Sequence, residues 1–131
     1  MTSRNFIITS MAAVAVAVLI SAVPDSAVLS KEGSNTVVNT TLLTKNVRGF
    51  KGATPLKITI RKNRVVKIEA LKNHESPQYF AKAKTLLSKY EGKTVTKAQK
   101  MNVDAVSGAT FSSKALIKNV KEGLTYYKQH K

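Results

Sequence analysis

Apolar and polar residues alternate over two adjacent stretches in the middle of the chain. Apolar residues take every second position, namely Leu56, Ile58 and Ile60 in the first stretch and Val66, Ile68 and Ala70 in the second. A period of two is typical of strands that bury one face. Between the stretches, Asn63 tolerates the left-handed backbone that a tight turn needs. The pattern predicts a β-hairpin from about Pro55 to Lys72.

Two later segments have the apolar spacing of helices. The first begins with an N-cap residue and a first-turn proline, Ser76 and Pro77, and ends at Gly92. Its apolar positions recur every three or four residues: Tyr79, Phe80, Ala83, Leu86, Leu87 and Tyr90. The second helix begins after Thr110 and has the buried stripe Ala115, Leu116, Ile117, Val120 and Leu124. Between the two helices we expect a short helical turn at 96–101 and an extended segment at 103–106.

The order of these elements predicts a small α+β fold, in which an antiparallel sheet with a hairpin packs against two main helices. The folded domain is expected to span residues 47–131. Residues 28–46 are polar and β-branched, and Asn35, Asn39 and Thr40 interrupt any apolar period. This segment is therefore predicted to be either a linker or a first structural element.

An uncharged segment rich in Ala, Val and Ile runs from Phe6 to Val23, behind Arg4. As a helix it would be about 27 Å long, slightly short of the roughly 30 Å hydrocarbon core of a bilayer. We interpret residues 1–27 as a hydrophobic signal peptide or membrane anchor, with 6–23 as its apolar helix. The positive head stays inside and the rest of the chain crosses the membrane. The protein is thus expected to be exported, either periplasmic or on the cell surface, whether or not the segment is cleaved.

The chain is strongly basic, with 22 Lys and Arg against 7 Asp and Glu and a formal net charge of +15. This charge is compatible with a generic solvated surface, and it would attract an anionic membrane surface or an acidic protein. Nucleic acid is not expected, because the chain carries an export signal and its lysines are dispersed over all elements. There is no cysteine, and His74 and His130 are the two histidines, so iron–sulfur clusters, c-type haem and thiolate zinc are excluded and no metal site is expected.

The segment before the last helix has the chemistry of a phosphate site. Gly108 frees the backbone and Ala109 keeps the approach uncrowded, while Thr110 lies where the helix begins. Unpaired N–H groups at a helix start favour a phosphate, and Ser112 and Ser113 in the first turn could donate to it. A simpler alternative is that Thr110 only caps the helix with its hydroxyl. Walker, dinucleotide-binding and hydrolase nucleophile motifs are missing, and with so few His, Asp and Glu no catalytic residues are expected.

A longer motif in this segment resembles a known family. Asp104-Ala105-Val106-Ser107-Gly108-Ala109-Thr110 is similar at every fixed position to the Asp-x-x-Ser/Thr-Gly-Ala-Thr motif of the FMN-binding domain family. That family includes peripheral flavin subunits of Na⁺-pumping NADH:quinone reductases and Rnf-type complexes. Gly49-Phe50-Lys51-Gly52 and His74-Glu75-Ser76-Pro77 resemble two further family segments, in the same order. The likeness covers about Val47 to Val120, although the turn at Lys62-Asn63 lacks the usual Asp-Gly and Gln78 replaces a frequent glycine.

The resemblance implies that FMN is the cofactor and is joined to Thr110 through a phosphoester. In the family a separate Mg-dependent flavin transferase makes this bond with FAD as the donor. By the same resemblance, the transferase recognises Asp104 in the acceptor motif, Ser107, Gly108 and Ala109 shape the loop, and His74 and Glu75 lie near the isoalloxazine ring. The expected function is that of an extracytoplasmic electron carrier, more than a free-standing enzyme, with a membrane-bound or exported redox partner. The alternative is a basic exported binding module without flavin.

Overall fold

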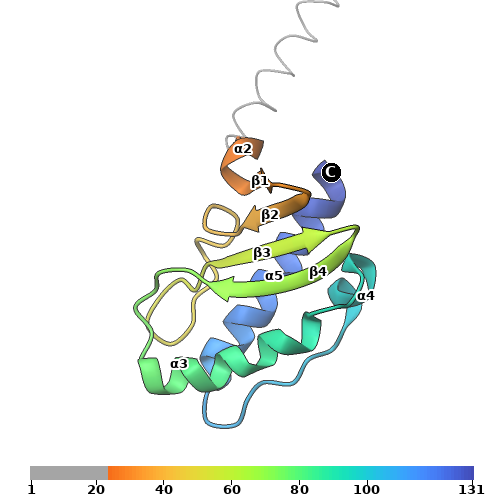
Figure 1. Cartoon of the computed structure of the whole chain (residues 1–131). Helices are drawn as coiled ribbons and strands as arrows, with labels where there is room; N and C mark the ends of the chain where they lie inside the picture. The colour runs from red at the N-terminus through yellow and green to blue at the C-terminus, as the bar shows by residue number, and fades with distance from the viewer. Residues whose placement is uncertain (1–23) are drawn as a thin grey trace, which may run out of the picture.

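The computed structural model describes residues 24–131, and the predicted signal or anchor helix at 6–23 lies outside the described residues (Figure 1). A four-stranded antiparallel sheet forms one layer, with the strands in the order β1-β2-β3-β4. The strands are β1 Leu29–Glu32, β2 Asn35–Asn39, β3 Leu56–Arg61 and β4 Arg64–Ala70. A short helix, α2, precedes them at Asp25–Val28. Helices cover one face of the sheet, so the predicted α+β class is confirmed.

The predicted hairpin is present as β3 and β4. Lys62 and Asn63 both have left-handed φ values, 51° and 61°, which is the geometry of the tightest hairpin turns. Ile58 pairs with Ile68, but the register shifts between Thr59 and Ile60, where the ladder is irregular. Val66 therefore points outward and is 43% exposed, and Val65 takes the core position opposite Ile60. The prediction that Val66 alternates into the core was wrong, because a bulge interrupts the period of two.

Residues 29–39 form β1 and β2, which extend the sheet beyond the hairpin. Val38 pairs with Ile58 and Val37 with Thr59. The segment that the sequence left open between a linker and a first element thus contributes two strands, and the buried Val28 and Val38 belong to the core. Its polar residues are accommodated because the strands are short and β1 is largely exposed.

The helices follow the predicted order with one interruption. α3 spans Pro77–Lys84 and continues as the 3₁₀ helix η1, Thr85–Tyr90, in place of a single α-helix up to Gly92. α4 spans Val95–Lys100 and α5 spans Thr110–His130. Residues 103–106 pair with no strand. Among residues 24–131, no helix combines the length and the apolar character needed to cross a bilayer.

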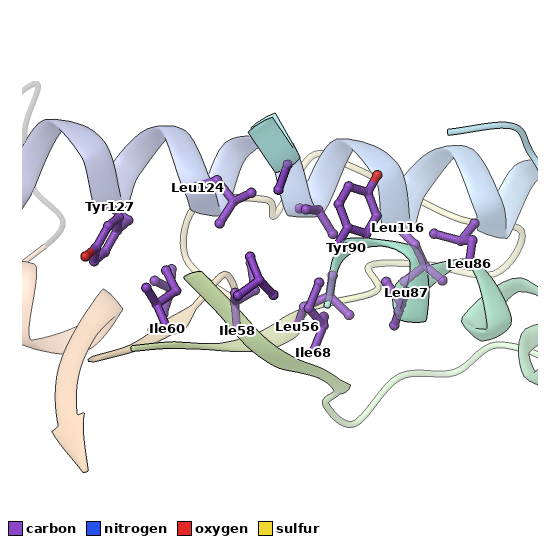
Figure 2. Close-up of a cluster of buried hydrophobic side chains, with 14 of the residues drawn as sticks. Leu56, Ile58, Ile60, Ile68, Leu86, Leu87, Tyr90, Leu116, Leu124 and Tyr127 are labelled. Carbon is purple, nitrogen blue, oxygen red and sulfur yellow. The ribbon is translucent and has the colours of Figure 1, made fainter. Parts of the chain in front are cut away.

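The core lies between the sheet and α5. Figure 2 shows Leu56, Ile58 and Ile60 pointing from β3 toward the helix, where Leu116 and Leu124 meet them. Leu86, Leu87 and Tyr90 of η1 cover the end of this core nearest the start of α5. α5 is 21 residues long, about 31 Å, and runs from the end of the molecule near α3 to the end near α2 (Figure 1).

Candidate functional site

The loop before α5 turns sharply into the helix. Gly108 has φ +85°, and nothing lies within 4 Å of the place where a Cβ would sit, so glycine is needed here for its conformation. The N–H of Ala109 donates to the Val106 carbonyl at 3.0 Å, and the N–H of Ser113 donates to the Ala109 carbonyl at 2.9 Å. The Ser113 hydroxyl accepts from the Val106 N–H at 3.0 Å. Ser113 is fully buried, and its hydroxyl therefore secures the end of the loop.

Thr110 is the first residue of α5 and is exposed. Ala109 occupies the N-cap position, so the capping role considered for Thr110 is not what the structure shows. Within residues 24–131 the Thr110 hydroxyl makes no hydrogen bond, and the N–H groups of Thr110, Phe111 and Ser112 donate to no acceptor. An accessible hydroxyl thus lies beside three free donors at the positive end of a long helix dipole.

A cavity of about 270 Å³ opens beside this helix start. It is lined by Phe50, Ser76, Tyr79, Gly108, Ala109, Thr110, Phe111 and Ser112. The rings of Phe50 and Phe111 have centroids 6.2 Å apart and are tilted by 41°, and they are 68% and 67% exposed. Tyr79 follows the apolar spacing predicted for this helix and lies within α3, but it is 52% exposed and does not belong to the core. Exposed aromatic side chains around a cavity are suited to binding a planar apolar ligand.

Glu75 lies behind the cavity and is only 7% exposed. One carboxylate oxygen, Oε1, accepts from the Phe50 N–H at 2.7 Å and from the Ser112 hydroxyl at 2.6 Å. The other, Oε2, accepts from the Lys51 N–H at 2.5 Å. The backbone N–H of Glu75 donates to the side-chain oxygen of Asn73 at 3.0 Å. Glu75 thereby connects the 49–52 loop to the first turn of α5.

A second buried group holds the base of that loop. Asn119 of α5 is fully buried, and its Oδ1 accepts from the hydroxyls of Thr40 and Thr44 at 2.6 and 2.7 Å. Its Nδ2 donates to Thr54 at 3.3 Å and to the Ala115 carbonyl at 3.0 Å. The segment between β2 and β3 is therefore fixed to α5 on both sides of Phe50.

The structure separates the residues that the sequence grouped together. Gly108, Ala109, Thr110 and Ser112 line the cavity, and Glu75 and Ser113 support it from behind. His74 and Ser107 are exposed and do not line the cavity. Asp104 lines a separate hollow of about 310 Å³ with Tyr90 and Lys121. Sequence reasoning did not assign Phe50, Tyr79 and Phe111 to the site, and their signal was that three aromatic residues lie within or next to the family-like segments.

A comparison with family models shows to which family the chain belongs. The model of the FMN-binding domain matches residues 49–125, which include the 49–52 loop, Glu75, the aromatic side chains and Thr110. The chain belongs to the FMN-binding domain family. FMN is accordingly the cofactor of this domain, and a search of the curated proteins finds no match.

The residues at the cavity of this FMN-binding domain fit FMN. The free N–H groups at the start of α5 suit its phosphate, since they supply donors and a positive dipole end. The aromatic side chains Phe50, Tyr79 and Phe111 suit its isoalloxazine ring. Lys114, one turn along α5, is exposed, and the ammonium group of Lys82 lies 5.9 Å from the centroid of the Tyr79 ring. One cavity thus offers N–H donors suited to the phosphate of FMN and aromatic side chains suited to its ring.

Proposed function

We propose that this protein is an extracytoplasmic electron carrier whose FMN is esterified to the Thr110 hydroxyl. The observation that carries the proposal is the position of that hydroxyl. It is exposed, makes no hydrogen bond within the described residues, and lies at the mouth of an aromatic cavity in a domain of an FMN-binding family. A side-chain oxygen at this point would hold the phosphate against the free N–H groups of α5 and leave the ring beside the aromatic side chains.

Attachment requires a partner enzyme, a flavin transferase that takes FAD as the donor. The Thr110 oxygen forms a bond to the phosphorus of the FMN half, the pyrophosphate bond breaks, and AMP leaves. The hydroxyl proton goes to a base or solvent on the transferase side. Thr110 is then a substrate and not a catalyst, and its exposure gives the transferase access.

The remaining residues bind and orient. The Ser112 hydroxyl is already donated to Glu75 and the Ser113 hydroxyl lies buried in the loop, so the backbone N–H groups are the donors for the phosphate. The bound flavin supplies reversible electron uptake. Among residues 24–131, Tyr79 is the one titratable side chain that lines the cavity, which favours a carrier over an enzyme with acid–base chemistry of its own.

Export and partners complete the proposal. The apolar segment 6–23 behind Arg4 supports transfer across the membrane, with or without a retained anchor. Because a single-site carrier must exchange electrons with another protein, the redox partner is itself exported or membrane-bound. The high positive charge would favour an acidic partner or an anionic membrane surface.

The test is intact-mass spectrometry after coexpression with a flavin transferase. The account predicts an added mass of FMN minus water on the wild-type chain and its loss in Thr110→Val. Thr96→Val, a change of an exposed threonine on α4, is the matched control and keeps the added mass. A bare wild-type chain, alongside an acceptor protein that the same transferase modifies, would favour the flavin-free binding module.

A further inference from the structure

The Glu75 carboxylate is buried, and its hydrogen-bond donors come from two separate segments. Phe50 and Lys51 supply backbone N–H groups from the 49–52 loop, and Ser112 supplies a hydroxyl from the first turn of α5. None of the three salt bridges among residues 24–131 involves Glu75. A buried carboxylate without a cation must be satisfied by such donors, and it then fixes their relative positions.

The loop residue next to these donors, Gly49, has no room for a side chain. A Cβ on Gly49 would lie 2.2 Å from Oε1 of Glu75 and 2.9 Å from its Cδ, distances that no side chain can occupy. Gly49 itself has no positive φ, so the glycine is required by the close approach of the carboxylate and not by backbone conformation. The loop and Glu75 are thus fitted to each other.

We propose that Glu75 is the positioning residue of the flavin site. Through the Phe50 and Lys51 N–H groups it holds Phe50 beside Phe111, and these two rings form the wall against which the isoalloxazine ring would lie. Glu75 itself lies behind that wall. This inference rests on the proposed function for the presence of flavin at this cavity, whereas the hydrogen-bonded clamp between the loop and α5 is independent of it.

The substitution Glu75→Gln tests the clamp with little change in volume. A carboxylate accepts at both oxygens, but an amide accepts at one and donates at the other. Whichever way the introduced amide turned, the N–H of Phe50 or of Lys51 would face another donor. Gly49→Ala disrupts the same contact from the loop side, because the added Cβ would collide with the Glu75 carboxylate. Gly52→Ala is the matched control, because its added Cβ would meet only an Arg48 nitrogen, at 4.0 Å.

Two readouts decide the proposal. On the unmodified chain, hydrogen exchange of the Phe50 and Lys51 amides is expected to be slow in the wild type and in Gly52→Ala, and faster in Glu75→Gln and Gly49→Ala. On the flavinylated chain, intact mass is expected to show the added flavin in all four proteins, while the visible circular dichroism and fluorescence anisotropy of the flavin fall in Glu75→Gln and Gly49→Ala.

Three outcomes would overturn it. Unchanged amide exchange in both test variants would remove the clamp. Faster exchange with unchanged flavin signals would mean that Glu75 stabilises the loop without positioning the flavin. An equal loss of flavin circular dichroism and anisotropy in Gly52→Ala would mean that any change in the loop disturbs the ring. A wild-type chain that carries no flavin contradicts the proposed function instead, and the exchange measurement then still decides whether the clamp exists.

Discussion

At the scale of single residues, three neighbouring hydroxyls at the start of α5 have different roles because of where they lie. Thr110 is exposed and its hydroxyl is free within the described residues, whereas Ser112 and Ser113 are 4% and 0% exposed. Ser112 donates to Glu75 and Ser113 accepts from Val106. Of these three hydroxyls, the one of Thr110 is thus accessible to a separate enzyme, which would explain a single attachment point under the proposed function.

A residue-scale prediction concerns Tyr90, which is 2% exposed. Burial raises the pKa of Tyr90 to about 12, so the folded state holds the phenol proton more tightly than the unfolded state does. The stabilisation is complete below the ordinary pKa of about 10 and is lost as the pH rises toward 12. Between about pH 9 and pH 11, the free energy of unfolding in urea should fall by roughly 1 kcal/mol more for the wild type than for Tyr90→Phe. Equal falls in the two proteins would contradict this.

At the scale of elements, the position of α5 on the sheet depends on one close approach. A Cβ on Gly123 would lie 2.7 Å from Cδ1 of Ile58 and 2.9 Å from Cγ2 of Thr40. Thr40 cannot move aside freely, since its hydroxyl donates to Asn119 and accepts from the Leu56 N–H at 2.8 Å. Through these hydrogen bonds, Thr40 also holds the β2–β3 connection, and with it the 49–52 loop, against α5.

The element-scale prediction is therefore that Gly123→Ala destabilises the protein. Alanine is the better helix former by about 1 kcal/mol, but overpacking against β3 should outweigh this and give a net loss of about 1–2 kcal/mol. Lys118→Ala, an exposed change on the same helix, serves as control and should be nearly neutral. Urea unfolding measures both, and a Gly123→Ala variant that is more stable than the wild type would show that the sheet and helix can separate without cost.

The elements also mark what the sequence could and could not predict. The β3–β4 hairpin and the start of α5 follow from local signals, namely alternation around Asn63 and the small residues before Thr110. The outward Val66 could not be predicted, because it depends on a bulge set by pairing with β3. The role of Glu75 depends on donors 24, 25 and 37 residues away, and no local pattern contains such contacts. FMN and Thr110 were predicted from the motif. The aromatic residues lie within or next to the family-like segments, but the pairing of Phe50 with Phe111 depends on the packing of distant segments.

At the scale of the whole molecule, charge is unevenly distributed. All three salt bridges among residues 24–131 join lysines of β3 and β4 to Glu32 and Glu69 on the strands. From residue 77 onward the chain has eleven lysines and three acidic residues, and no salt bridge is found in this part of the structure. Lys82 and Lys84 on α3 and Lys114 on α5 belong to this excess, and both helices line the flavin site, so the electrostatic potential there is positive.

The corresponding prediction is that Lys114→Ala lowers the midpoint potential of the bound flavin. A nearby cation stabilises the negative charge gained on reduction, so its removal should shift the potential downward by on the order of 10 mV, less at high salt. Lys62→Ala should leave the potential unchanged, because Lys62 lies in the hairpin turn whose Asn63 accepts from the Tyr127 hydroxyl near the far end of α5. A redox titration measures all three proteins, and an unchanged potential in Lys114→Ala would contradict the electrostatic role of the helix lysines.

The most direct test of the account is peptide mapping by tandem mass spectrometry of the protein purified from its own host. The account predicts that the peptide containing Ser107 to Ser113 carries FMN less water and that fragment ions assign it to Thr110. A peptide of unmodified mass, from cells in which the flavin transferase modifies other proteins, would contradict the account, as would flavin attached to any other residue.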